Sequence, residues 1–194
     1  MISAPSGAGK TTLCRGLMDK LAGVQFSISH TTRAPRPAER DGFDYHFVTP
    51  ERFEELVEHN EFLEWAHVHG RCYGTSRRSV KTGLAQGIDI LFDIDVQGGQ
   101  QIHAANIDAI LVFVLPPNMA ILEERLRRRR SDSEEQIAQR LQAARDEINT
   151  ARGLYTHWIV NDDLPTAVDK LRSILIAERL RRIDVPALLN SMLG

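Results

Sequence analysis

The chain has 194 residues, of which 42% are hydrophobic and 26% are charged. These values are typical of a soluble globular protein of one domain, with or without an insertion, and they exclude a disordered tail, a collagen-like fibre and a disulfide scaffold. With 24 basic and 26 acidic side chains, the net charge of -2 provides no overall positive field for non-specific binding of nucleic acid or a membrane.

The cellular setting follows from three further features. Two cysteines, Cys14 and Cys72, are too few for a disulfide framework and lack the spacing of metal ligands. No apolar run approaches the roughly 20 residues that span a bilayer. The first residues show no basic stretch followed by an apolar core, as a signal peptide would. We therefore expect a cytoplasmic protein that contacts neither membrane nor nucleic acid.

The residues on either side of the segment 30–87 show alternating strand and helix patterns. The apolar runs at 88–94 and 109–115 are continuous, which indicates strands buried on both faces of a parallel sheet. The first strand has only about four residues, whereas a central strand usually has about five or six. The predicted strands are 1–4, 24–29, 88–94, 109–115 and 157–160. The predicted helices are 11–21, 98–105, 118–127, a long helix ending near 152, and 165–181.

The segment 30–87 has a different texture. It carries prolines, arginines and short aromatic runs, with one predicted helix at 50–59. Short strands separated by turns predict a small mixed sheet inserted between the parallel elements. At the other end of the chain, the apolar residues of 186–192 predict a short docking helix or a self-association contact.

A glycine-rich turn after the first predicted strand carries the strongest single signal. Its two glycines let the backbone turn its N–H groups toward an anionic phosphate, and the N-terminus of the following helix adds to the attraction. Lys10 supplies charge to the β- and γ-phosphates, and the Thr11 hydroxyl is placed to bind Mg²⁺. The alternative is a turn without a ligand. The P-loop pattern is met at every position except the first, where alanine replaces glycine. The loop residues are Ala4, Pro5, Ser6, Gly7, Ala8, Gly9, Lys10 and Thr11.

Two acidic residues, Asp93 and Asp95, lie at the end of an apolar strand. The carboxyl end of a parallel strand lies beside a P-loop, so Asp93 can organise Mg²⁺ through water. The alternative is an ordinary cap at the end of a strand.

Six separated motifs decide between the classes of P-loop protein. They occur in the order found in the guanylate kinase family, and the resemblance extends to about residue 177. The motifs are residues 29–37 (SHTTRAPRP), 41–47 (DGFDYHF), 61–65 (EFLEW), 73–75 (YGT), 93–98 (DIDVQG) and 161–162 (ND).

This resemblance implies a nucleoside monophosphate kinase in three parts. The fold would be a three-layer α/β/α P-loop core with a parallel sheet, an inserted mixed α/β segment and a helical lid. The core would comprise 1–29, 88–124 and 153–194. The GMP-binding insertion would be 30–87, and the lid with its adjoining helix would be 125–152.

The resemblance also implies an acceptor pocket with a phosphate side and a base side. Arginine forks and phenol donors suit a doubly charged phosphate. A carboxylate that only accepts hydrogen bonds matches the N1–H and N2–H donors of guanine, and hydroxyls can donate to its O6 atom. Adenine reverses this pattern. The GMP phosphate would contact Arg33, Arg36, Tyr45 and Tyr73, and the guanine would contact Ser29, Glu64, Thr75 and Asp95.

For the donor side, the resemblance adds Thr12, Asn161 and Asp162 to the P-loop as ATP contacts. The residues implied in catalysis are Lys10, Arg36, Arg129 and Arg140. Arg129 lies within a run of four arginines, 127–130, any of which could substitute for it. For its three neighbours we favour a solvated helix end.

We therefore predict Mg²⁺-dependent transfer of the γ-phosphoryl group of ATP to GMP, giving ADP and GDP. The small-molecule partners are ATP and GMP, and the oligomeric state stays open. Two alternatives remain. An interaction module with this fold would be expected to lose phosphate-loop or lid residues, which this chain retains. A sugar-phosphate kinase gives no reason for Glu64 and the tyrosine pair.

Overall fold

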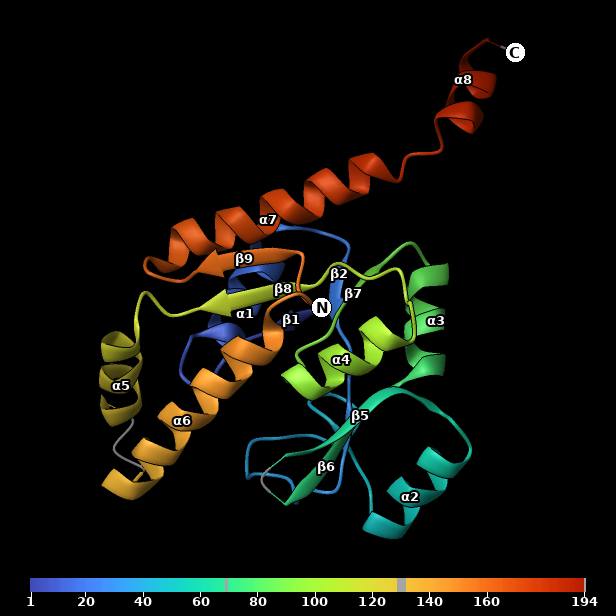
Figure 1. The fold of residues 1–194 in the computed structure, drawn as a ribbon. Helices are drawn as coiled ribbons and strands as arrows, with labels where there is room; N and C mark the ends of the chain where they lie inside the picture. The colour runs from blue at the N-terminus through green and yellow to red at the C-terminus, as the bar shows by residue number, and fades with distance from the viewer. Residues whose placement is uncertain (69, 129–131, 194) are drawn as a thin grey trace.

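Five parallel strands form the central layer of the computed structural model, which describes residues 1–68, 70–128 and 132–193 (Figure 1). Parallel ladders join β1 to β8, β8 to β9, and β2 to β7. A single bridge between Ile2 and Asp93 connects the two groups, so the strand order is β2-β7-β1-β8-β9. These strands are β1 (Ile2–Ser3), β2 (Val24–Phe26), β7 (Asp89–Leu91), β8 (Val112–Leu115) and β9 (His157–Val160).

Helices cover both faces of this layer. On one face, α1 (Lys10–Lys20) packs against α7 (Leu164–Arg181) over the strands. On the other, α4 (Val96–Ala104) lies beside α6 (Glu134–Ala151) (Figure 1). The successive β8 side chains Val112, Phe113 and Val114 are all buried, as continuous apolar strands between two helical layers require. The predicted three-layer α/β/α fold is confirmed.

A second sheet occupies the segment between β2 and β7. Its strand order is β4-β3-β6-β5, with β3 parallel to β4 and antiparallel to β6. The predicted mixed sheet is therefore present, together with a helix, α3, that the sequence patterns did not indicate. The elements are β3 (His30–Thr31), β4 (His46–Phe47), α2 (Pro50–Glu58), β5 (Phe62–Val68), β6 (Arg71–Ser76) and α3 (Arg77–Ala85).

The remaining helices are α5 (Met119–Arg128) and α8 (Val185–Leu193). The α6 helix begins with a capping box between Ser133 and Gln136, which fixes its start after the arginine run. The predicted apolar helix near the C-terminus is α8, and it extends away from the core (Figure 1). Over the ranges that the structure describes, the helices are too short or too polar to cross a bilayer.

Four strands are shorter than predicted, and two of them, β2 and β7, have three residues each and end at Phe26 and Leu91. The β1 strand has two residues, and β8 begins at Val112 because Asn106 adopts a left-handed conformation and the chain turns again at 107–109. The N-terminal ends of β1 and β8 lie at the same end of the sheet, beside Met1, whose amino group donates a hydrogen bond to the Ile110 carbonyl oxygen.

Candidate active site

The loop between β1 and α1 has the conformation that a phosphate cradle needs. Gly7 and Gly9 have φ values of 95° and 94°, in the left-handed region that favours glycine. Gly9 is the N-cap of α1 and provides no side-chain cap, so the N–H groups of the first turn are left for a ligand. Thr11 and Thr12 expose their side chains on that first turn.

The Asn161 side chain supports this loop by a hydrogen bond to its backbone. Its side chain is 5% exposed, and its Nδ2 atom donates a 2.8 Å hydrogen bond to the Ala8 carbonyl oxygen. A Cβ atom on Gly9 would lie 2.4 Å from the same Nδ2 atom. The structure thus places the Asn161 side chain beneath the P-loop, while Asp162 is exposed. The sequence motif gave no signal for this supporting contact, because it links residues 153 positions apart.

Lys10 is held at the end of β7. Its ammonium group lies 2.6 Å from an Asp93 carboxylate oxygen and donates to the Ile94 carbonyl oxygen at 2.8 Å. Asp93 therefore contacts the P-loop lysine, as expected for an acid at the carboxyl end of a parallel strand. No group of three or more His, Cys, Asp or Glu side chains suited to a metal occurs among the described residues.

Glu64 and Thr75 form a buried pair between β5 and β6. The Thr75 hydroxyl donates to a Glu64 carboxylate oxygen at 2.5 Å, and neither side chain is more than 4% exposed. Burial raises the pKa of Glu64 to about 7; the hydrogen bond from Thr75 and the Lys10 charge oppose this shift, and Asp95 adds to it. Lys10 and Asp95 therefore lie near enough to Glu64 for their charges to act on it.

The N-terminus of α4 borders this pair closely. A Cβ atom on Gly98 would lie 2.5 Å from Glu64 Oε2, so the helix can approach only because residue 98 is glycine. Asp95 caps the same helix by accepting a hydrogen bond from the Gly98 amide at 2.9 Å. Ser29 is half-buried, and its carbonyl oxygen accepts from the His46 amide.

Arg33 and two tyrosines lie together at the edge of the second sheet. The Arg33 guanidinium carbon is 5.3 Å from the centre of the Tyr45 ring, and the Tyr45 and Tyr73 ring centres are 6.1 Å apart. Burial raises the pKa of Tyr45, and the Asp93 charge raises it further. Tyr45 thus lies within electrostatic reach of the P-loop end of the core. Three of the four predicted phosphate contacts therefore form one cluster.

Glu39, which the sequence patterns did not indicate, organises this cluster. Its two carboxylate oxygens accept hydrogen bonds from Arg33 at 2.8 and 2.9 Å, and one of them also accepts from the Arg36 amide. This pairing raises the pKa of Arg33 and lowers that of Glu39. Arg36, the fourth predicted phosphate contact, has an exposed side chain.

The α5–α6 region contributes Arg140, which lies 3.2 Å from Asp132 and is about one third exposed. Arg127 pairs with Glu123 and Glu134, and Arg128 pairs with Glu124, all on the exposed surface. Arg129, the other predicted lid residue, lies outside the described residues.

Glu147, seven positions after Arg140, is a further site candidate that sequence reasoning missed. Two helical turns separate the two residues, so they share a face of α6. Burial raises the pKa of Glu147 to about 7, and both Lys10 and Asp95 influence it. Glu147 therefore lies on the face of α6 that packs toward α4, near enough to Lys10 and Asp95 for their charges to act on it.

Comparison with known proteins gives a consistent result. The family model described as guanylate kinase matches residues 1–178. The chain is 50% identical to a guanylate kinase from Methylobacillus flagellatus, over 94% of this chain and 90% of that protein. It is 56% identical to one from Anaeromyxobacter dehalogenans, over 93% and 80%. The crystal structure of guanylate kinase from Anaplasma phagocytophilum superposes with a TM-score of 0.74 at 31% identity, covering 98% and 92% of the two chains.

Proposed function

The chain belongs to the guanylate kinase family, and from this membership we propose how its own residues bind and align the two substrates. It is a nucleoside monophosphate kinase that transfers the γ-phosphoryl group of ATP to GMP. The P-loop, with Lys10 and Thr12, holds the ATP phosphates, and Asn161 supports that loop. The Glu64–Thr75 pair, where β5 and β6 meet the N-terminus of α4, binds the guanine.

The observation that carries this proposal is the buried Glu64–Thr75 pair. A carboxylate buried without a cation needs hydrogen-bond donors, and the N1–H and N2–H groups of guanine are two such donors on adjacent atoms. The Lys10 charge acts on Glu64, which supports a base-binding pair close to the P-loop.

Mg²⁺ is the metal that these residues fit. The Thr11 hydroxyl is exposed on the first turn of α1, and the Asp93 carboxylate lies at the end of β7. A hydroxyl and one carboxylate suit Mg²⁺, which is usually bound by few protein ligands together with substrate phosphates. When bound, it would neutralise charge on the β- and γ-phosphates.

The reaction needs alignment and charge neutralisation more than covalent work by the protein. A GMP phosphate oxygen forms a bond to the γ-phosphorus as the bond from that phosphorus to the β,γ-bridging oxygen breaks, and ADP leaves. Arg33, Arg36, Tyr45 and Tyr73 hold the GMP phosphate. Lys10, with Arg140 and Arg129, balances the charge that spreads over the moving group.

The experiment that tests this proposal measures ADP release with GMP, AMP, UMP and a sugar phosphate as acceptors. We expect turnover with GMP and at most about 10⁻⁴ of that kcat/KM with AMP, since adenine leaves Glu64 unpaired. Glu64→Ala should lose GMP affinity and this discrimination. Glu61→Ala, an exposed acid three positions earlier, is the matched control and should behave as the parent chain. Equal use of a sugar phosphate, or no transfer to GMP, contradicts the proposal.

We also infer a cytoplasmic setting from the cysteines. Both Cys14 and Cys72 are free thiols. Cys14 lies in the core, where burial raises its pKa to about 12, so it acts as a small apolar side chain. Free thiols of this kind suit a reducing compartment.

A further inference from the structure

The edge strand β5 carries Glu64 at a point where its pairing with β6 is irregular. Within the described part of the chain, β5 pairs with β6 alone, so its other edge is open to groups outside the sheet. The register shifts between Phe62 and Glu64, where Leu63 is the extra residue. A bulge of this kind bends the strand and changes the direction of nearby side chains, so the ladder alone does not fix the Glu64 carboxylate.

The backbone of Trp65, the residue after Glu64, is bound by the side chain of Gln101. The Gln101 Oε1 atom accepts a hydrogen bond from the Trp65 amide at 3.0 Å, and Gln101 Nε2 donates to the Trp65 carbonyl oxygen at 2.5 Å. Both residues are half-buried. One side-chain amide thus satisfies the N–H and the C=O of the same residue, as the opposite residue of an antiparallel strand would.

The same side of α4 also borders the Glu64 carboxylate. Gly98 lies three positions before Gln101, so the two residues share one side of the helix. A Cβ atom on Gly98 would lie 2.5 Å from Glu64 Oε2 and 3.2 Å from Glu64 Cδ. Gly98 therefore lets the helix come close to Glu64, and Gln101 holds the strand at that distance.

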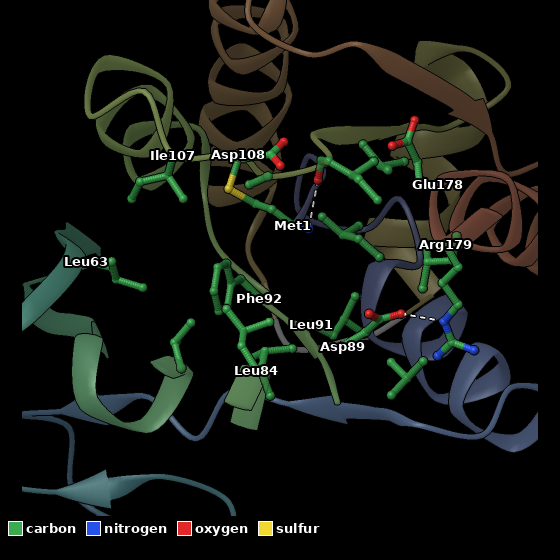
Figure 2. Close-up of a pocket in the computed structure, with 18 of the residues that line it drawn as sticks. Met1, Leu63, Leu84, Asp89, Leu91, Phe92, Ile107, Asp108, Glu178 and Arg179 are labelled. Carbon is green, nitrogen blue, oxygen red and sulfur yellow. Dashed lines mark hydrogen bonds and ion pairs between the residues drawn. The ribbon is translucent and has the colours of Figure 1, made fainter. Parts of the chain in front are cut away.

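The extra residue of the bulge makes a contact of a different kind. Leu63 packs against the core cluster that contains Phe92, and the two side chains line the same groove (Figure 2). An apolar contact has no preferred direction, whereas two hydrogen bonds to one residue restrain both its position and its rotation. Gln101 therefore gives this part of β5 a directional link to the core that the Leu63 contact cannot provide.

We propose that Gln101 is a positioning residue for guanine recognition. By binding the peptide groups of Trp65, it holds the adjacent Glu64 carboxylate where the N1–H and N2–H groups of guanine can donate to it. This inference rests on the proposed function, because it takes Glu64 as the residue that binds the base. Gln101 belongs to a helix that covers the central sheet and Glu64 to the second sheet, so their link also sets how the two parts meet at the base.

The test replaces Gln101 by methionine, which has a similar length and no amide. We expect Gln101→Met to raise KM for GMP about tenfold, because a small displacement of a positioned group has a large effect. The kcat value and KM for ATP should stay within twofold, since the P-loop lies on other elements. Gln100→Met, an exposed neighbour on α4, is the matched control and should behave as the parent chain.

Gln101→Asn is the second variant. It keeps the amide but is one methylene shorter, so it can reach at most one of the two Trp65 backbone groups. We expect KM for GMP to rise about threefold, between the values of the parent chain and Gln101→Met. If the methionine variant does not fold, this variant carries the test. An unchanged KM for GMP in the folded variants overturns the proposal.

A double-mutant cycle with Glu64→Ala shows whether Gln101 acts through Glu64. In the Glu64→Ala background, Gln101→Met should change the Kd for GMP less than twofold further, because the positioned carboxylate is gone. A merely structural role would give the same fold-change in both backgrounds, and that result overturns the proposal. If Glu64→Ala weakens GMP binding and Gln101→Met does not, only this inference fails. If Glu64→Ala leaves GMP binding unchanged, the assigned role of Glu64 fails and the inference fails with it.

Amide hydrogen exchange tests the contact itself. The Trp65 amide should exchange at least about tenfold faster in Gln101→Met than in the parent chain, while the Val114 amide in β8 keeps its parent rate. Equal exchange rates at Trp65 in the two chains would show that Gln101 does not hold this strand, and they overturn the proposal.

Discussion

The Lys10 ammonium and the Asp93 carboxylate lie 2.6 Å apart, and the same ammonium donates to the Ile94 carbonyl. The residues that follow β7 thus hold the Lys10 ammonium in place without a bound phosphate. This contact orients the lysine, and it also means that phosphate oxygens and Asp93 share one positive charge. A residue placed at this junction should affect phosphoryl transfer much more than binding of the acceptor.

Replacing Lys10 by alanine tests that expectation. We predict that Lys10→Ala lowers kcat/KM by about 10³-fold, because a preorganised positive charge at the transferring group is lost. The Kd for GMP should stay within about twofold, since the acceptor pocket lies on other elements. Steady-state kinetics and calorimetry measure the two quantities. Lys20→Ala, in the last turn of the same helix, is the control. Normal turnover in Lys10→Ala would remove the P-loop from the mechanism.

The loop glycine that approaches Asn161 provides a second prediction. In Gly9→Ala, the new Cβ would lie 2.4 Å from the Asn161 amide nitrogen and the residue would keep a positive φ. We expect a loss of about 3 kcal/mol in unfolding free energy and weak ATP binding, measured by urea unfolding and calorimetry.

Gly42→Ala is the matched control for that variant. Its φ is also positive, at 72°, but no atom lies within 4 Å of the new Cβ. It should therefore show the backbone strain alone, about 1–2 kcal/mol, with ATP binding retained. If the two variants lose the same stability and bind ATP equally well, the Asn161 contact does not hold the loop.

Local patterns in the sequence predicted the fold more completely than they predicted the contacts within the site. The P-loop and the βα alternation depend on neighbouring residues, so glycine spacing and continuous apolar runs indicate them directly. The β1, β2, β7 and β8 strands were predicted too long. For β1 and β8, the ends depend on the turn at 107–109 and on the position of Met1, which packing across the sheet determines.

The supporting residues of the site could not be predicted in this way. Glu39 contacts Arg33 through a loop, and Asn161 contacts Ala8 across 153 positions of sequence. Glu147 is one of many acids on a helix, and only its burial on the inner face sets it apart. Such roles depend on which surfaces the fold brings together, and no local pattern carries that information.

Glu39 should act as a positioning residue for the acceptor phosphate. In Glu39→Gln one side-chain oxygen and the carboxylate charge are lost, so the two-pronged hydrogen bond to Arg33 cannot form. We expect KM for GMP to rise about tenfold while kcat falls less than threefold. Glu39→Asp should recover part of the loss. Kinetics with ATP saturating measure both constants, and an unchanged KM in Glu39→Gln would show that Arg33 is held by its other neighbours.

The inner face of α6 can be tested at Arg140. We predict that Arg140→Ala lowers kcat by about 10²-fold or more, because an arginine that neutralises the moving phosphoryl group is removed. Arg145→Ala lies on the same helix with an exposed side chain and should keep normal kcat. Equal kcat values for the two variants would place Arg140 outside the reaction. Circular dichroism of both variants checks that α6 is intact.

The pH dependence of GMP binding follows from Glu64. Burial raises the pKa of this carboxyl group to about 7 in the protein. Guanine requires the ionised form, because only that form accepts both of its N–H donors. Below pH 7 the ionised fraction falls, so the affinity for GMP should decrease about tenfold between pH 8 and pH 6.

The phosphate of GMP also titrates in this range, with a second pKa of about 6, so guanosine is the cleaner probe. Calorimetry with guanosine should show the full decrease in affinity for the parent chain and none for Glu64→Gln, whose amide does not titrate. The same decrease in Glu64→Gln would assign the effect to another group, for which Glu147 is the next candidate because its pKa is also raised to about 7. Adding Glu147→Gln to Glu64→Gln then removes the second titration as well, so the loss of the remaining pH dependence in the double variant would assign it to Glu147.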